Sequence, residues 1–564
     1  MQENQTIWLI LRKLRVPILF VIVSFALSTL LMMIVPGTPG PDGTPTHLSF
    51  FDAFYVVVYT ATTIGYGEIP QAFSYEQRFM ATISIFLTVP VWFFAIGKIV
   101  TLLQDKVFLR AIAHNRFARE VANIKSDFIV ICGYNRISKL IIEKLIAENR
   151  FRIVVIDKSP EKIDELALEE YHPHIPALMA DITQTSVLRA AGVSLPNCRF
   201  IVTLFEDDDL NLKISVKARI LNANIKIIGK ATVKQGVQNL IDLGVDKVID
   251  PFDHVATRLD FALRAPFLFT LLNWINGGNL NVNRTDLLPR GRYIVCSRGR
   301  FGKSISAVLE KNGIEYVNLD INKEIKEKKL ADSDSFKEAG IETASAIIAG
   351  TADDAINLSI VMTARKLNPS IFVLARENEL EESSMFAHLK AEKVFLMDRL
   401  VAISAFNYIA RPLADQFINK LSEYSNEWAK TLVIRLTKTI NKKPRLAEIM
   451  LTCDSAHALC GWANRPITYG DLVLDPWHNG QKLKIVIIAV KKVSGELIMA
   501  PDHDYVFEYG DDLLIAGTPE SINQFEHIIN NEKLLHFVLT GSERRIFIFE
   551  QLQRIMGRTP PKEE

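Results

Sequence analysis

Two apolar segments near the start of the chain constrain its fold more than any other feature. Residues 16–35 and 79–103 carry almost no charge, and each is long enough to cross the roughly 30 Å hydrocarbon core of a bilayer as a helix. Basic residues precede the first segment and follow the second. By the positive-inside rule, we expect a multi-pass protein of the cell (inner) membrane, in contact with membrane lipid and with both termini in the cytoplasm.

The loop between these segments predicts an ion path. Residues 50–62 read as an apolar helix that is too short to span the bilayer. Irregular backbone at membrane depth is tolerated only where it lines a water-filled path, so a re-entrant loop should follow. Rings of backbone carbonyls from four copies can replace the hydration shell of K⁺, and glycine permits the required backbone angles. The residues expected to form this selectivity filter are Thr63, Ile64, Gly65, Tyr66 and Gly67.

The filter stretch resembles the potassium-channel signature TVGYG, with Ile64 in place of valine. The resemblance implies that K⁺ is the permeant ion. No segment carries arginine at every third position, so we expect gating by something other than a voltage sensor. Within the second span, Pro90 removes a backbone hydrogen bond and Gly97 follows near the inner end. We predict a gate hinge at these two residues, with a static kink as the alternative.

From residue 126 onward, the chain alternates short apolar runs with amphipathic stretches, which indicates βαβ units and a parallel sheet. The pattern occurs twice. Asp207 and Asp208 correspond to Asp353 and Asp354, and Lys230 corresponds to Arg376, all with an offset of 146 residues. Such a constant register indicates a tandem duplication. The first strands match at a larger offset of 164 residues, so the second copy should be shorter, with the loss around residues 161–179.

Each copy has a glycine turn after its first strand that is a degraded form of GxGxxG, followed by an acidic residue that ends the second strand. In a dinucleotide site, the turn approaches the pyrophosphate and the acid binds the ribose. Basic residues near the second turn, including Lys303, favour phosphate. The predicted nucleotide-binding residues are Gly133, Asn135, Arg136, Ile137, Asp157, Lys158 and Asp181 in the first copy, and Ser297, Arg298, Gly299, Arg300, Phe301 and Asp320 in the second.

A pore followed by two such domains resembles the potassium channels that are gated by regulator-of-potassium-conductance (RCK) domains. The resemblance implies a membrane α-helical pore, two α/β Rossmann-like RCK domains and a C-terminal α+β subdomain. It also implies a homotetramer whose eight RCK domains form an octameric, ligand-gated ring. The expected divisions are a pore domain at 1–105, a linker at 106–125, RCK domains at 126–290 and 291–425, the C-terminal subdomain at 426–530 and a tail at 531–564.

The sequence alone does not identify the regulatory ligands. An adenine nucleotide (NAD, ADP or AMP) is expected at one or both turns, and a fold that binds nothing is the alternative at the first. A Ca²⁺ site could use acidic clusters, either Glu206, Asp207 and Asp208 or residues 377–382. The net charge of +1 argues against nucleic acid as a partner.

No catalytic constellation accompanies either turn, so we do not expect an enzyme. The alternative function is a nucleotide-binding regulatory component of a potassium transporter. The five cysteines are widely spaced and odd in number, which fits a reducing cytoplasm better than a disulfide framework.

Overall fold

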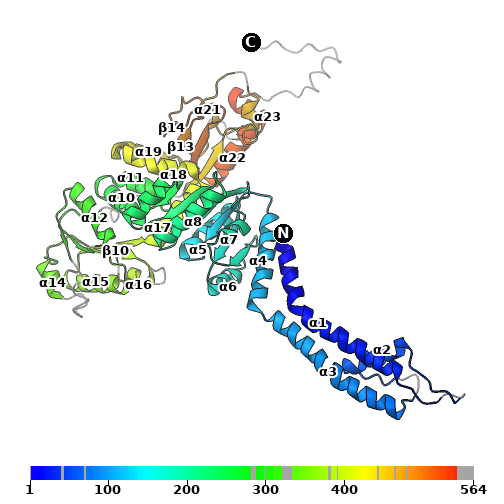
Figure 1. The fold of residues 1–564 in the computed structure, drawn as a ribbon. Coiled ribbons are helices and arrows are strands. Elements are labelled where there is room, and N and C mark those ends of the chain that lie inside the picture. Colours follow the sequence, from blue (N-terminus) through cyan, green and yellow to red (C-terminus); the bar gives the residue numbers. More distant parts are fainter. Residues whose placement is uncertain are drawn as a thin grey trace, which may run out of the picture. The chain divides into compact units, whose positions relative to one another are not determined.

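The computed structural model describes residues 2–39, 43–68, 72–280, 288–297, 299–319, 333–378, 383–389, 391–440, 444–462, 465–477 and 481–542. Arg298, Asp320 and residues 379–382, which belong to the predicted ligand sites, lie outside these ranges. The chain divides into two compact units, one formed mainly by residues 1–125 and the other by nearly all of the remainder (Figure 1).

The first unit contains four helices: α1 (Gln2–Ile34), α2 (Phe50–Ala61), α3 (Tyr75–Leu103) and α4 (Lys106–Ala122). Two stretches are long and apolar enough to cross a membrane, Leu14–Ile34 and Tyr75–Leu103. Both expose large apolar side chains, such as Ile22 at 61% and Phe86 at 77%. A soluble protein would bury such surface, whereas lipid accommodates it.

The short helix α2 packs against both α1 and α3. It starts at the predicted residue because the Ser49 hydroxyl accepts a hydrogen bond from the Asp52 amide and caps the helix. Its buried face, which includes Ala53 and Val57, shares an apolar core with Met32 of α1. Helix α1 begins earlier than the predicted span, because the residues before Val16 contain no glycine or proline to end the helix.

The second unit begins with a six-stranded sheet in the order β3-β2-β1-β4-β5-β6. This is the strand order of a doubly wound dinucleotide-binding fold. The strands are β1 (Phe128–Cys132), β2 (Arg152–Asp157), β3 (Ala177–Met179), β4 (Cys198–Thr203), β5 (Lys226–Lys230) and β6 (Lys247–Ile249). The intervening helices are α5 (Arg136–Glu148), α6 (Pro160–Leu168), α7 (Thr185–Ala190), α8 (Asp208–Leu221) and α9 (Lys234–Asp242).

The second copy forms a sheet in the order β11-β10-β9-β7-β8. Its order repeats that of the first sheet, but the described residues contain no counterpart of β3, which fits the predicted shortening. The strands are β7 (Tyr293–Cys296), β8 (Tyr316–Asn318), β9 (Ala346–Ala349), β10 (Phe372–Glu377) and β11 (Lys393–Leu396). The helices are α12 (Arg300–Lys311), α14 (Ser333–Glu338), α15 (Asp354–Leu367) and α16 (Ser383–His388).

A buried asparagine occupies the same place in both copies and confirms the duplication. The side-chain amide of Asn211 donates to the carbonyl oxygens of Phe205 (2.8 Å) and Lys230 (2.9 Å). The amide of Asn357 donates to the carbonyl oxygens of Thr351 (3.1 Å) and Arg376 (2.9 Å). Each asparagine thus joins the ends of two neighbouring strands, which fixes the carboxyl edge of the sheet where ligands bind in this fold.

The two copies exchange their crossover helices. Helices α10 (Pro251–Arg264) and α11 (Pro266–Ile275) follow the first sheet, and α17 (Met397–Ala410) and α18 (Pro412–Lys420) follow the second. Helix α10 packs on α12 and α17 packs on α5. The Asp260 carboxylate accepts from Lys311 (3.1 Å) and Asn312 (2.9 Å) across the first contact. The crossover helices therefore join the two copies.

The remaining residues form the predicted α+β subdomain around an antiparallel sheet in the order β12-β15-β13-β14. Alternate side chains enter opposite cores, as in Ile487 and Ile488, because successive residues of a strand face opposite sides. The strands are β12 (Arg445–Met450), β13 (Ile485–Lys491), β14 (Leu497–Met499) and β15 (Asp512–Gly517). The helices are η3 (Leu421–Glu423), α19 (Asn426–Ile440), α20 (His457–Cys460), α21 (Tyr469–Leu472), α22 (Pro519–Asn530) and α23 (Glu532–Thr540).

Candidate functional sites: the filter loop and the glycine turns

The backbone after α2 alternates in handedness. Thr63, Gly65 and Gly67 have positive φ angles of 62°, 62° and 71°. The expectation that both glycines adopt left-handed backbone is therefore met. Thr63 also adopts it, which is costly for a β-branched residue; its amide donates to the Thr60 carbonyl at 3.0 Å and holds it there.

The loop leaves a row of carbonyl oxygens free. The amides of Ile64 and Gly65 donate to the Tyr59 carbonyl at 2.9 and 3.2 Å. No hydrogen bond between described residues ends on the carbonyl oxygens of residues 63–66. Backbone carbonyls without partners are costly unless water or a ligand satisfies them. These oxygens are the ligands that a dehydrated cation needs.

Aromatic side chains hold the loop against α2. The ring of Tyr66 stacks on Tyr55, with centroids 6.5 Å apart, and meets the edge of Tyr59 at 6.4 Å. The Tyr59 hydroxyl donates to the backbone carbonyl of Glu68 at 3.2 Å. The side chain of Tyr66 thus packs on α2 and fixes the position of the loop.

Helix α3 runs unbroken through both predicted hinge residues, Pro90 and Gly97. A break at Pro90, which the sequence allowed, does not occur. Nothing lies within 4 Å of a Cβ placed on Gly97, so this position has room to bend. The hinge role of both residues stays a prediction.

The glycine turn of the first copy is satisfied by its own side chains. Asn135 caps α5 by accepting from the Ser138 amide (2.9 Å), and the Ser138 hydroxyl accepts from the Asn135 amide (2.6 Å). Gly133 has φ of 89°, and the ring of Phe205 lies 2.5 Å from a Cβ placed on it. A pyrophosphate would contact the N-terminus of α5 and the open side of Gly133. Protein side chains already occupy both places.

Asp157, the predicted ribose acceptor of the first copy, also accepts hydrogen bonds from the protein itself. The two carboxylate oxygens of Asp157, a buried residue, accept from the amides of Tyr134 (2.7 Å) and Ser159 (2.8 Å). Asp181 and Lys158 lie at the surface. The hydroxyl of Thr183 donates to Asp181 and lowers the pKa of that carboxyl.

The other predicted residues of the first turn have mixed exposure. The side chain of Ile137 is buried in the core, and Arg136 is half-buried. The structure brings the predicted set together at one edge of the sheet, but protein groups already engage most of its polar atoms.

In the second copy, the N-cap residue has no side chain that could cap the following helix, in contrast to Asn135 of the first copy. Gly299 is the N-cap of α12, and no side chain caps this helix. A Cβ placed on Gly299 would meet nothing within 4 Å, whereas one on Gly302 would lie 1.7 Å from the Ser297 carbonyl oxygen. These are the two glycine roles of a phosphate-binding turn: one admits the ligand and one lets the helix approach the strand.

A cavity of about 410 Å³ lies over this turn. The second copy supplies most of its wall, and the loops after β4, β5 and β6 of the first copy supply the rest. Its size suits part of a nucleotide. The lining residues are Ser297, Gly299, Arg300 and Phe301 from the turn, Cys296, Gly350, Thr351, Ala352, Asp353, Ile356 and Arg376 from the rest of the second copy, and Glu206, Thr232 and Phe252 from the first.

Two guanidinium groups enter the cavity with unused donors. Arg300 forms an ion pair with Asp250 through Nη2. Its Nε and Nη1, and Nε of Arg376, are buried and have no acceptor among the described residues. The Arg376 guanidinium lies 5.2 Å from the Phe252 ring centroid and 5.5 Å from that of Phe301. Burial lowers the pKa of Arg376, although Asp354 and Glu206 oppose the shift. Buried donors without acceptors are costly, and an anion would satisfy them.

Each carboxylate of the acidic cluster predicted to bind Ca²⁺ already interacts with a donor group of the protein. Glu206 forms an ion pair with the buried Lys230. Asp207 caps α8 by accepting from the amides of Asp209 and Leu210. Asp208 accepts from the amides of residues 232 and 233 at 2.9 and 2.8 Å. In the described ranges, no group of three metal-ligating side chains converges, and the Ca²⁺ site at this cluster stays a prediction.

Sequence reasoning missed several residues of the cavity, among them Arg376, Phe252 and Thr232. The repeat register aligns Arg376 with Lys230 and could have identified Arg376 as a cation at the edge of the sheet. The other two belong to the first copy, and only the exchanged packing of the copies brings them to the second turn.

Comparison with known proteins assigns the two units. Residues 18–105 match the ion channel domain family, and residues 129–251 and 293–397 each match the TrkA-N domain family. Potassium channel protein 1 of Methanocaldococcus jannaschii is 28% identical over 304 residues, which is 53% of this chain and 84% of that protein. Probable potassium channel protein 2 of the same organism is 28% identical over 206 residues, covering 36% of this chain and 58% of that one.

Among solved structures, a GsuK channel bound to NAD covers 93% of this chain and 99% of its own, with 16% identity and a TM-score of 0.41. The two relatives are channels rather than enzymes, in agreement with the expectation from sequence.

Proposed function

We propose that this chain, which belongs to the ion channels that carry TrkA-N domains, forms a potassium-selective pore whose opening is controlled by a nucleotide bound to its second α/β domain. The observation that supports conduction is the row of free carbonyls at residues 63–66, held against α2 by Tyr66. Four such rows around an axis would replace the water shell of K⁺.

The assembly is a homotetramer in the inner membrane, surrounded by lipid and with both termini in the cytoplasm. Each chain contributes two α/β domains, so four chains would supply an octameric ring. The exchanged crossover helices, α10 on α12 and α17 on α5, show how such domains pair within one chain. A pore within the same chain favours this function over a regulatory subunit that acts on a separate transporter.

The nucleotide site that we favour lies at the second turn. The observation that supports it is the set of buried N–H donors without acceptors on Arg300 and Arg376 beside the uncapped N-terminus of α12. A helix N-terminus and guanidinium groups together bind phosphate oxygens. ADP, AMP and the ADP portion of NAD share this chemistry.

A ligand in this cavity would touch both copies, because Glu206, Thr232 and Phe252 of the first copy form part of the wall. Filling the cavity therefore favours one arrangement of the two copies over others. A ligand shifts an equilibrium only by its difference in affinity between the states. Helix α4 is the covalent connection through which such a change reaches α3.

Arg376→Met tests the nucleotide site, because it keeps an unbranched side chain but removes the guanidinium that lies over the Phe252 ring. We expect the affinity for ADP, measured by calorimetry on the purified full-length protein, to fall by about 10- to 100-fold, because a hydrogen bond to a charged group contributes about 1.5–3 kcal/mol. The matched control is Arg136→Met, which changes the residue of the first turn that corresponds to Arg300. Equal losses in the two variants, or none in Arg376→Met, would reject the second turn as the site.

A further inference from the structure

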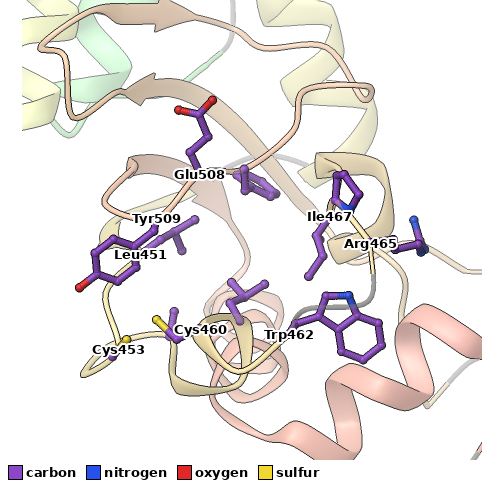
Figure 2. A pocket seen from close by; sticks show the side chains of 12 residues that line it. Leu451, Cys453, Cys460, Trp462, Arg465, Ile467, Glu508 and Tyr509 are labelled. Carbon is purple, nitrogen blue, oxygen red and sulfur yellow. The ribbon is translucent and has the colours of Figure 1, made fainter.

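The C-terminal subdomain contains a second cavity, of about 420 Å³, that no step of the proposed gating uses. It lies between the turn after β12, the short helix α20 and the loop that precedes β15 (Figure 2). Apolar side chains such as Leu451 and Ile467 line its inner part, and Tyr509 lies at its rim beside two cysteines.

These cysteines, Cys453 and Cys460, form an adjacent pair of thiols. Figure 2 shows their sulfur atoms side by side, and the Cys453 thiol is among the groups that raise the pKa of Cys460. Both residues are exposed and neither is in a disulfide. The other cysteines, Cys132, Cys198 and Cys296, are buried in the α/β sheets. Only this pair therefore combines access to solvent with a second thiol in reach.

The backbone holds the pair together independently of the sulfur atoms. The amide of Ala456 donates to the Thr452 carbonyl at 2.7 Å, which turns the chain between the two cysteines. The amide of Cys460 donates to the Ala456 carbonyl at 3.2 Å at the end of α20. The side chain of Asn530 in α22 bonds to Ser455 and His457 and anchors the segment. A disulfide needs its two Cα atoms within about 7 Å, and these backbone contacts hold the two cysteines in one short segment.

The charge state of the pair suits stepwise exchange. Desolvation, the Cys453 thiol and Asp454 together raise the pKa of Cys460 to about 11. The Cys460 thiol therefore retains its proton at neutral pH. A thiolate is the attacking species in disulfide exchange, and a neighbouring thiol resolves the mixed disulfide.

We propose that Cys453 and Cys460 are a modification site that low-molecular-weight disulfides oxidise reversibly to an internal disulfide. In the first step, one thiolate attacks a disulfide RSSR, forms a mixed disulfide and releases RS⁻. In the second, the other cysteine loses its proton, attacks the protein-bound sulfur and releases a second RS⁻. The two thiolates released take up the two thiol protons, so two cysteine thiols and RSSR become one protein disulfide and two RSH.

The oxidised form would fix α20 to the turn after β12 and constrain the rim of the cavity. In a reducing cytoplasm the dithiol is the resting form, and cytosolic disulfides that do form are usually transient or redox-sensing. This agrees with the absence of a disulfide framework in the sequence.

The test uses purified full-length protein, oxidised glutathione as the probe and peptide mapping by mass spectrometry after alkylation. Wild-type protein should lose two hydrogens in a peptide pair that links Cys453 to Cys460, and dithiothreitol should restore both thiols. Cys453→Ser and Cys460→Ser each lack the resolving thiol, so each should retain one glutathione on the remaining cysteine. Cys132 should stay reduced throughout and serves as the buried control.

Several results would overturn the proposal. One is wild-type protein that keeps glutathione on Cys453 or Cys460 without the internal link. Another is oxidation of Cys132 at the same rate as the pair, which would show that the reaction follows unfolding. Full alkylation of both thiols after exposure to oxidised glutathione would also contradict it, because the pair would then be unreactive.

Discussion

Replacing Gly299 with alanine should separate ligand binding from folding at the second turn. Gly299 has φ of −64° and ψ of −170°, which is extended backbone that alanine adopts without strain. A Cβ at this position meets no atom within 4 Å. We therefore expect the free energy of unfolding to change by less than about 1 kcal/mol.

The same methyl group would occupy the space through which a phosphate reaches the first amides of α12. Losing one such charge-assisted hydrogen bond costs about 1.5–3 kcal/mol. At 1.4 kcal/mol per tenfold change, ADP should bind about 10- to 100-fold more weakly. Calorimetry with ADP and thermal unfolding of the ligand-free protein measure the two quantities on the same sample.

Asn135→Ala is the matched control, because Asn135 holds the corresponding place in the first turn and caps α5. Its loss should destabilise the protein by about 1 kcal/mol and leave the affinity for ADP unchanged. The opposite outcome, weaker ADP binding in Asn135→Ala and normal binding in Gly299→Ala, would refute the reasoning and move the ligand to the first copy.

The remaining predictions concern the filter, the first turn and pH. Gly65→Ala should abolish K⁺ conduction in bilayers, because φ of 62° favours glycine. Normal currents would contradict the assignment of these residues to the filter. Asp157→Ala leaves two amides without acceptors and should cost about 1–3 kcal/mol in thermal unfolding, with ADP affinity unaffected. Burial raises the pKa of Glu448 to about 7, above about 4.3 for an unfolded chain. Its contribution to stability is therefore full below pH about 4.3 and lost as pH rises through about 7. Unfolding of Glu448→Gln should depend less on pH between these values, and an unchanged profile would exclude Glu448 as the source.

The repeat could be predicted because its cause is local and periodic. Asp208 and Asp354 begin the corresponding helices of the two copies, and each accepts a hydrogen bond from the amide after the next strand, at residue 232 or 378. A fixed offset preserves such contacts, so the register seen in the sequence already implied two equivalent sheets. The shorter second copy followed from the different offset of the first strands.

The choice between the two turns could not be predicted, because both carry partial glycine motifs. It depends on whether a side chain caps the helix: Asn135 does so in the first copy, and Gly299 cannot in the second. The partners of the acidic cluster could not be predicted for a similar reason. Glu206 looks like a metal ligand in the sequence, but Lys230 and the cavity wall define its role, and both are brought to it by folding.

The most direct test records single-channel current from the purified protein in a bilayer with K⁺ on one side and Na⁺ on the other, before and after ADP is added to the cytoplasmic face. The account predicts a reversal potential close to the K⁺ equilibrium value and a change in open probability with ADP. A reversal potential that treats Na⁺ and K⁺ alike would contradict the filter, and currents indifferent to ADP would contradict control by the second domain.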